Sequence, residues 1–219
     1  IAGAARRAGR DPSAARLIAV SKTFPADYVR AAAEAGQVDF GENKVQEAQQ
    51  KIAALADLSS LRWHLIGHLQ SNKARKAGSL FHAIHSIDAA TLMEPIDKAA
   101  QSAGRAVELL VQVDLAGEAT KFGATPDALL PIFDAAARCT SAHIVGLMLI
   151  PPAVEDPEQA RPYFARLRAL RDALVKQGIP PASLHELSMG MSHDYEVAVE
   201  EGSTMVRVGT AIFGARTYA

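Results

Sequence analysis

Short runs of apolar residues recur along the whole chain, and longer segments in which apolar residues follow a helical spacing separate them. Several runs are almost entirely apolar, for example LLVQV and IVGLMLI, which is typical of parallel strands covered on both faces. We therefore predict eight strands, over residues 17–21, 38–40, 63–67, 81–86, 107–114, 143–150, 184–188 and 205–209.

The segments between these runs have the spacing of amphipathic helices, with one apolar stripe and charged residues away from it. Two stripes show this most clearly, one formed by Val45, Ala48, Ile52 and Leu55 and the other by Phe164, Leu167, Leu170 and Leu174. The pattern thus predicts strands and helices in regular alternation along the chain.

Eight strand-then-helix units in 219 residues predict a (β/α)8 barrel, also called a TIM barrel, at the short end of its size range. The alternative is an open, doubly wound sheet. That fold usually has a glycine-rich turn for phosphate after its first strand, and the sequence SKTFP offers none. No linker, repeat or low-complexity tract divides the chain, so we expect residues 1–219 to form a single domain without a second one.

Charge and composition narrow the classes of protein that fit. Lys plus Arg number 23 against 24 Asp plus Glu, and this net charge of −1 argues against a nucleic-acid-binding protein. Cys139 is the only cysteine, so no internal disulfide forms and a reducing compartment, the cytoplasm, is expected. No apolar run approaches the roughly 20 residues that a membrane span needs. The chain begins with Ile1, so we expect its natural start to be missing.

In a barrel of this kind the chemistry lies at the carboxyl ends of the strands, and two of these ends indicate an anion site. SMGMS places Ser188 and Ser192 around Gly190, and VGT places Gly209 and Thr210 before a short turn. Hydroxyls and backbone N–H groups at helix starts favour an anion, and barrels often bind phosphate after strands 7 and 8. N-capping and turn formation explain either loop alone, but their joint position favours phosphate.

Lys22 follows the first predicted strand and places a charged group at the edge of the core, which is unfavourable unless the group has a partner or a function. A lysine normally has a pKa of roughly 10.4, and burial lowers it, which makes the amine a nucleophile for an aldehyde or ketone. A lysine that reaches solvent or pairs with a carboxylate is the commoner case. With a phosphate site nearby, the leading ligands are pyridoxal 5′-phosphate and a sugar phosphate.

Arg207 lies near the end of the last predicted strand. A guanidinium is always charged and accepts no proton, so opposite a pyridine nitrogen it would keep that nitrogen unprotonated. The alternative is an arginine that pairs with a phosphate or a carboxylate.

Several motifs together resemble the pyridoxal phosphate homeostasis proteins, which are single-domain relatives of the alanine racemase barrel. They are AVSKT, FGENKVQEA, WHLIGHLQSNK, GLMLIP, LSMGMS and GSTMVRVGTAIFG. The resemblance spans residues 17–218 and is specific in combination. It implies a fold type III barrel in which pyridoxal 5′-phosphate is bound as an imine on Lys22.

The resemblance also implies roles for further residues. Asn43 would lie beside the cofactor ring or its substituents, and Arg207 would face the pyridine nitrogen. The phosphate would be bound by the two loops, with Met189 close by, through Ser188, Ser192, Gly209 and Thr210. More loosely, His64 and Met148 would line the pocket.

Four residues depart from the family's usual pattern: Lys44 stands where Tyr is frequent, His68 where Pro is common, Asp114 where Asn is usual and His193 where Asp is frequent. None removes an expected cofactor contact, but Lys44 and His68 alter the expected rim of the pocket. The spacing of the histidines does not favour a shared ion, so no metal site is predicted.

The function that the resemblance implies is a carrier that buffers or delivers the cofactor, with no catalytic residues and with cofactor-free enzymes as transient acceptors. A racemase is the alternative. Racemases of this barrel have a second, β-rich domain that supplies a catalytic Tyr across a dimer interface, whereas this chain ends directly after the eighth unit. We therefore expect a non-catalytic monomer. A class I aldolase, with Lys22 binding a sugar carbonyl, accounts for the residues but not for the family resemblance.

Overall fold

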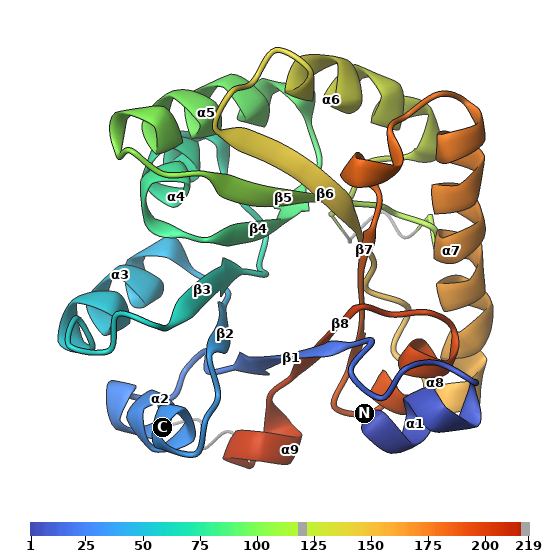
Figure 1. Cartoon of the computed structure of the whole chain (residues 1–219), viewed down its shortest axis with the longest axis horizontal. Helices are drawn as coiled ribbons and strands as arrows, with labels where there is room; N and C mark the ends of the chain where they lie inside the picture. The colour runs from blue at the N-terminus through green and yellow to red at the C-terminus, as the bar shows by residue number, and fades with distance from the viewer. Residues whose placement is uncertain (118–121, 216–219) are drawn as a thin grey trace.

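Eight parallel strands close into a barrel in the computed structural model of the chain, which describes residues 1–117 and 122–215. The strands follow one another around the barrel in sequence order, and the last pairs with the first (Figure 1). They are β1 (Arg16–Val20), β2 (Asp39–Glu42), β3 (Arg62–Leu65), β4 (Ala83–Ile87), β5 (Val107–Gln112), β6 (Ala142–Met148), β7 (Glu186–Met191) and β8 (Met205–Val208). The predicted (β/α)8 barrel is confirmed, and the open sheet is excluded.

Helices surround the strands on the outside of the barrel (Figure 1). The α-helices are α1 (Ala2–Arg7), α2 (Ala26–Glu34), α3 (Val45–Ala54), α4 (Ala74–Leu80), α5 (Met93–Ser102), α6 (Leu129–Ala136), α7 (Arg161–Lys176), α8 (Tyr195–Glu200) and α9 (Thr210–Phe213). Short 3-10 helices are η1 (Ser71–Lys73), η2 (Ala90–Leu92), η3 (Pro126–Ala128), η4 (Pro157–Ala160) and η5 (Pro181–Ser183).

The burial of these elements follows from their sequence patterns. Strand β4 is buried at every position, as a strand between the barrel interior and the helix layer must be. In α7, Phe164, Leu167 and Leu174 are buried, and they lie on the predicted stripe. Helix α3 buries Lys51 together with its apolar stripe, which is unusual for a charged side chain.

Strand β7 differs most from its predicted bounds, because it begins later and continues to Met191. Gly190 permits this extension: its φ is +96°, and a Cβ there would lie 2.5 Å from the Cβ of Ala198 in α8. Ser188 and Met189 are therefore inside the strand, and the loop after it begins near Ser192.

Other predicted bounds are displaced by one or a few residues. Strand β2 extends to Glu42, which brings this carboxylate into the sheet, and β5 ends at Gln112 before Asp114. The loop after β8 forms α9, a single turn of helix.

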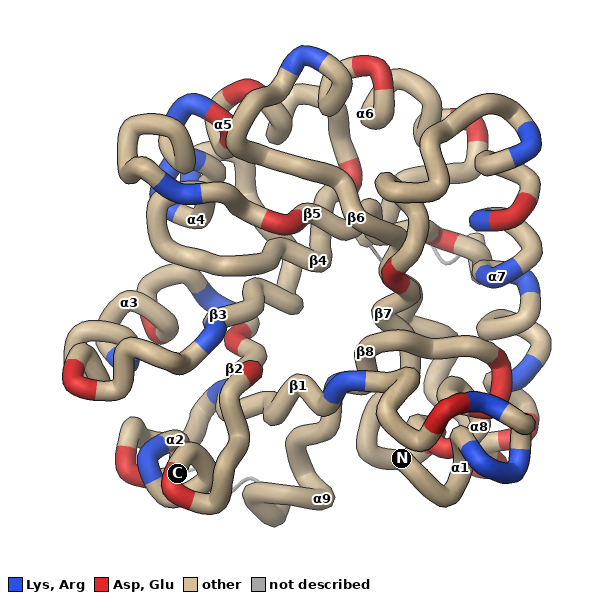
Figure 2. Tube along the Cα trace, in the orientation of Figure 1, with Lys and Arg blue, Asp and Glu red and all other residues tan. Residues whose placement is uncertain are grey.

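Charged residues of both signs are spread over the helices, without a stripe of one sign (Figure 2). None of the described helices combines the length and the apolar composition of a membrane span. The assignment of residues 1–219 to a single domain stays a prediction.

Candidate functional site

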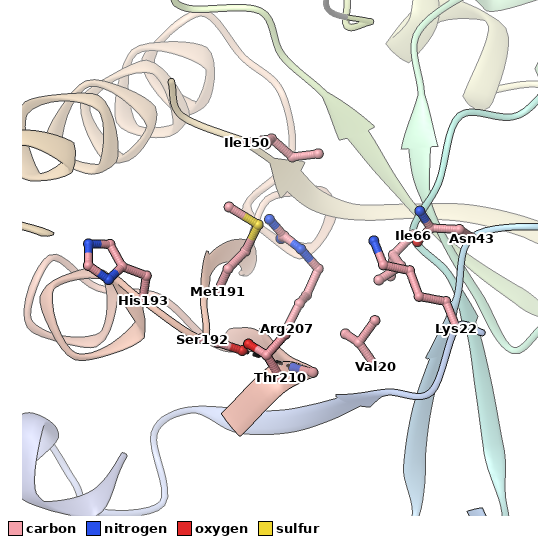
Figure 3. A pocket seen from close by; sticks show the side chains of 11 residues that line it. Val20, Lys22, Asn43, Ile66, Ile150, Met191, Ser192, His193, Arg207 and Thr210 are labelled. Atoms are coloured by element: carbon pink, nitrogen blue, oxygen red, sulfur yellow. Dashed lines mark hydrogen bonds between the residues drawn. The ribbon is translucent and has the colours of Figure 1, made fainter. Parts of the chain in front are cut away.

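A cavity of about 280 Å³ opens at the carboxyl ends of the strands. Residues from the beginning and the end of the chain meet there, because β1 pairs with β8 (Figure 3). The cavity is lined by Val20, Lys22, Asn43, Ile66, Ile150, Met191, Ser192, His193, Arg207, Gly209 and Thr210.

Lys22 lies just after β1, and its side chain is half-buried and points into the cavity (Figure 3). The guanidinium of Arg207 lies across the cavity from its amine, and Ser192 and Thr210 lie to one side (Figure 3). A primary amine, a fixed cation and a group of hydroxyls thus share one cavity.

The hydroxyl side of the cavity is formed where the loops after β7 and β8 meet. The backbone N–H of Gly209 donates a hydrogen bond to Ser192 Oγ at 3.1 Å, and that of Ala211 donates to the same oxygen at 3.5 Å. Thr210, which stands between Gly209 and Ala211 in the sequence, is exposed and also lines the cavity. This convergence of N–H and O–H donors suits an anion with several oxygens, such as a phosphate monoester.

Arg207 forms the floor of the cavity and is only 4% exposed. Its Nη1 donates to Ser188 Oγ at 2.6 Å and its Nη2 donates to the carbonyl oxygen of Leu149 at 2.8 Å. Burial lowers the pKa of Arg207 to about 10, so the guanidinium stays protonated at neutral pH. Two of its N–H groups are thereby anchored, while the side chain still borders the cavity.

The structure brings six of the predicted site residues together: Lys22, Asn43, Ser192, Arg207, Gly209 and Thr210. Asn43 lies against Gly67, where a Cβ would come within 2.4 Å of the Asn43 carbonyl oxygen. The close approach of β2 and β3 at their ends therefore depends on a glycine at this position.

Four other residues do not line this cavity. Ser188 is fully buried inside the barrel, and Met189, on the opposite face of β7, packs in the core between sheet and helices. His64 and Met148 are fully buried inside the barrel as well. Because alternate side chains of a strand point to opposite faces, Met189 turns toward the helices, whereas Ser188 points inward and lies below the mouth, since β7 continues to Met191.

Sequence reasoning did not single out the apolar walls of the cavity, which are formed by Val20, Ile66 and Ile150. The signal was present, because Val20 and Ile150 lie at or next to the carboxyl ends of predicted strands. Such positions border the mouth of a barrel and are available to a ligand.

Comparison with known protein families shows that the family described as "Alanine racemase, N-terminal domain" matches residues 3–217. A pyridoxal phosphate homeostasis protein of Aquifex aeolicus is 44% identical over 215 residues, which is 98% of this chain and 93% of that protein. One from Pseudomonas aeruginosa is 43% identical over 98% of this chain and 90% of its own length. This chain belongs to the pyridoxal phosphate homeostasis protein family.

Solved structures agree with membership of this family. PipY of Synechococcus elongatus, solved with PLP bound, superposes with a TM-score of 0.85 at 44% identity, covering 97% of this chain and 98% of PipY. D-threonine aldolase of Filomicrobium marinum has a TM-score of 0.72 at only 18% identity. The second comparison shows that the barrel alone recurs in a distant protein.

In this member of the pyridoxal phosphate homeostasis protein family, a buried ion cluster holds the backbone on both sides of Lys22. Lys51 Nζ lies 2.7 Å from Glu42 Oε1, 2.9 Å from Glu47 Oε1 and 2.7 Å from the Ser21 carbonyl oxygen. The Ser21 hydroxyl also donates to Glu42 Oε1, at 2.6 Å. The sequence carried a signal for this cluster, since Lys51 lies three residues after Ala48 on the apolar face of its helix.

The residue after Lys22 is held in the same way. Thr23 has a φ of +71°, an uncommon conformation for a β-branched residue that costs on the order of 1–3 kcal/mol. Its backbone N–H donates to Glu47 Oε1 at 2.5 Å. The cluster therefore stabilises a strained loop and fixes the direction in which Lys22 leaves β1.

We predict that Lys51→Met lowers the free energy of unfolding by about 3–5 kcal/mol, because Glu42 is left buried without its cation. Burial already raises the pKa of Glu42, against the hydrogen bonds from Lys51 and Ser21. A carboxyl with a raised pKa in the folded state favours folding only while it is protonated. The loss should therefore be smallest at acid pH and grow as pH rises through the pKa of Glu42.

Chemical denaturation across a range of pH measures this effect. Lys98→Met is the matched control, because Lys98 forms an exposed pair with Glu94 on the surface of α5, and we expect no measurable change. Equal stability of Lys51→Met and the unsubstituted protein would show that the cluster does not hold the loop.

Proposed function

We propose that this chain binds pyridoxal 5′-phosphate in the cavity, with Lys22 as covalent anchor, and acts in intracellular homeostasis of this cofactor. The observation that carries the proposal is the meeting of amine, guanidinium and anion-binding loops in one cavity of a barrel closely similar to PLP-bound PipY. The names of the relatives favour homeostasis over amino-acid racemisation.

The donors present fit the chemical groups of the cofactor. The N–H groups of Gly209 and Ala211, with the hydroxyls of Ser192 and Thr210, suit a phosphate. Those N–H groups donate to Ser192 Oγ, and the oxygen of a bound phosphate would take over that acceptor role. Asn43, Ile66 and Val20 form a polar and apolar wall against which a flat ring can lie.

Arg207 suits the ring nitrogen. Its guanidinium donates hydrogen bonds and accepts no proton, so a nitrogen opposite it keeps its lone pair. An unprotonated pyridine withdraws electrons less strongly, which favours holding the cofactor over stabilising a carbanion.

Pyridoxal 5′-phosphate, when bound, supplies an aldehyde that condenses reversibly with amines. Lys22 provides such an amine at the edge of the cavity, and the cluster around Lys51 fixes its backbone. The reversibility of the link allows release to another amine or to water. We infer that the chain is a non-catalytic carrier, and that enzymes lacking their cofactor are its acceptors.

Two further features of the proposal concern its setting. The chain is proposed to act as a monomer. Cys139 is the only cysteine of the chain and is free, which agrees with the reducing cytoplasm that we propose.

The anchor is tested by adding pyridoxal 5′-phosphate, recording the visible absorbance, reducing with borohydride and mapping the labelled peptide. We expect a visible band and a label on Lys22, and we expect Lys22→Ala to abolish both and to weaken binding at least about tenfold. Lys44→Ala is the control, because Lys44 is exposed and outside the cavity. A label on another lysine, or an undiminished band in Lys22→Ala, would contradict the proposal.

The phosphate loops make a separate prediction. Ser192→Ala should weaken binding of pyridoxal 5′-phosphate about 10- to 100-fold, because a hydrogen bond to a charged group contributes about 1.5–3 kcal/mol. Binding of pyridoxal, which lacks the phosphate, should change little. A titration that finds equal losses for both ligands would mean that Ser192 does not contact the phosphate.

A further inference from the structure

A continuous line of hydrogen bonds runs through the barrel from Arg207 to the opposite end. Ser188 Oγ, which accepts from Arg207, lies 2.8 Å from His85 Nδ1, and His85 Nε2 lies 2.9 Å from His64 Nδ1. His64 Nε2 lies 2.8 Å from Asp39 Oδ1. Five side chains, one each from β2, β3, β4, β7 and β8, are thus joined one after another by hydrogen bonds.

The line connects the cavity with solvent at the other end of the strands. Ser188, His85 and His64 are 0% exposed, whereas the Asp39 side chain is 16% exposed at the first residue of β2. Arg207 borders the cavity at the carboxyl ends. The line therefore crosses the interior of the barrel beside the apolar cluster formed by Ile18, Leu110, Met148 and Met205.

The chemistry of the groups gives this line one direction. Arg207 only donates, so Ser188 Oγ accepts from it, and the Ser188 hydroxyl proton is satisfied by donation to His85 Nδ1. Neutral His85 then carries its proton on Nε2 and donates to His64. Neutral His64 likewise carries its proton on Nε2 and donates to Asp39. Every polar atom along the line is satisfied in this arrangement.

The protonation states agree with this direction. Burial lowers the pKa of His64 and lowers that of His85 well below its ordinary value, so both rings are neutral at pH 7. Burial alone would raise the pKa of Asp39, but the hydrogen bond from His64 lowers it, with further contributions from the charges of Arg16 and Arg62. The described hydrogen bonds of Arg207 go to the Ser188 hydroxyl and the Leu149 carbonyl oxygen. The line that continues from Ser188 ends on a carboxylate, that of Asp39.

We propose that Asp39, His64, His85 and Ser188 are positioning residues, which form a one-directional hydrogen-bond relay that orients Arg207 toward the cavity. Each group that donates onward becomes a better acceptor, so the carboxylate at the far end strengthens the bond between Ser188 and Arg207. What Arg207 does for a ligand rests on the proposed function. The direction of the relay does not, because it is a property of the chain itself.

Asp39→Asn tests the relay from its far end. The amide oxygen of asparagine can still accept from His64 Nε2 but carries no charge, so the line keeps its direction and the bond at its far end weakens. Glu108→Gln is the matched control. Glu108 and Asp39 both pair with Arg62 at the same end of the barrel, with N–O distances of 3.2 and 3.3 Å, but Glu108 has no bond to His64.

The first measurement is the tautomer of each ring by nitrogen-15 NMR of histidine-labelled protein without added ligand. We expect His64 and His85 to be neutral with the proton on Nε2, and we expect the signal of His64 Nε2 to shift in Asp39→Asn but not in Glu108→Gln. A proton on Nδ1 of either ring in the unsubstituted protein would overturn the relay.

The second measurement is the dissociation constant for pyridoxal 5′-phosphate. Asp39→Asn should weaken binding about fivefold or more, within the usual range of coupling between distant sites, and Glu108→Gln should change it less than about twofold. Equal affinities in both variants would overturn the action on Arg207. If the unsubstituted protein binds no pyridoxal 5′-phosphate, the proposed function fails, whereas the expected tautomers would still support the relay.

Discussion

The pairing of the first strand with the last is the constraint on which the site depends. Ile18 in β1 is in register with Arg207 in β8, and Ala19 is in register with Val208. This closure places Lys22, which follows β1, beside Gly209 and Thr210, which follow β8. An amine and loops with several N–H and O–H donors, separated by most of the sequence, thereby face the same cavity. Without closure the two halves would lie at opposite edges of a sheet.

Much of this arrangement could be predicted from the sequence, because continuous apolar runs and helical stripes are local patterns. The eight strands followed from them, and so did the positions of Lys22, of Arg207 and of the loops after β7 and β8 at strand ends. The role of Ser188 could not be predicted in the same way. It depends on how far β7 continues, and therefore on the packing of Gly190 against Ala198. The apolar face of α3 indicates that Lys51 is buried, but the links of Ser188 to His85 and of Lys51 to Glu42 join separate elements, so no local pattern indicates these partners.

The interior of the barrel combines an apolar cluster with a line of polar side chains, and the two have different effects. The apolar residues contribute free energy through burial, without a fixed direction. The polar line contributes little net stability but specifies orientation, since a buried donor must meet its acceptor. In this chain the line ends on the cation at the floor of the cavity. A carrier needs such a fixed floor together with a reversible link at the mouth.

The most direct test of the carrier function is transfer of the cofactor to an enzyme that lacks it. The protein is loaded with pyridoxal 5′-phosphate, freed of unbound cofactor by gel filtration and mixed with an inactive, cofactor-free enzyme that requires it. The account predicts that enzyme activity rises as the visible band of the carrier falls. A band that persists while the enzyme stays inactive would contradict it.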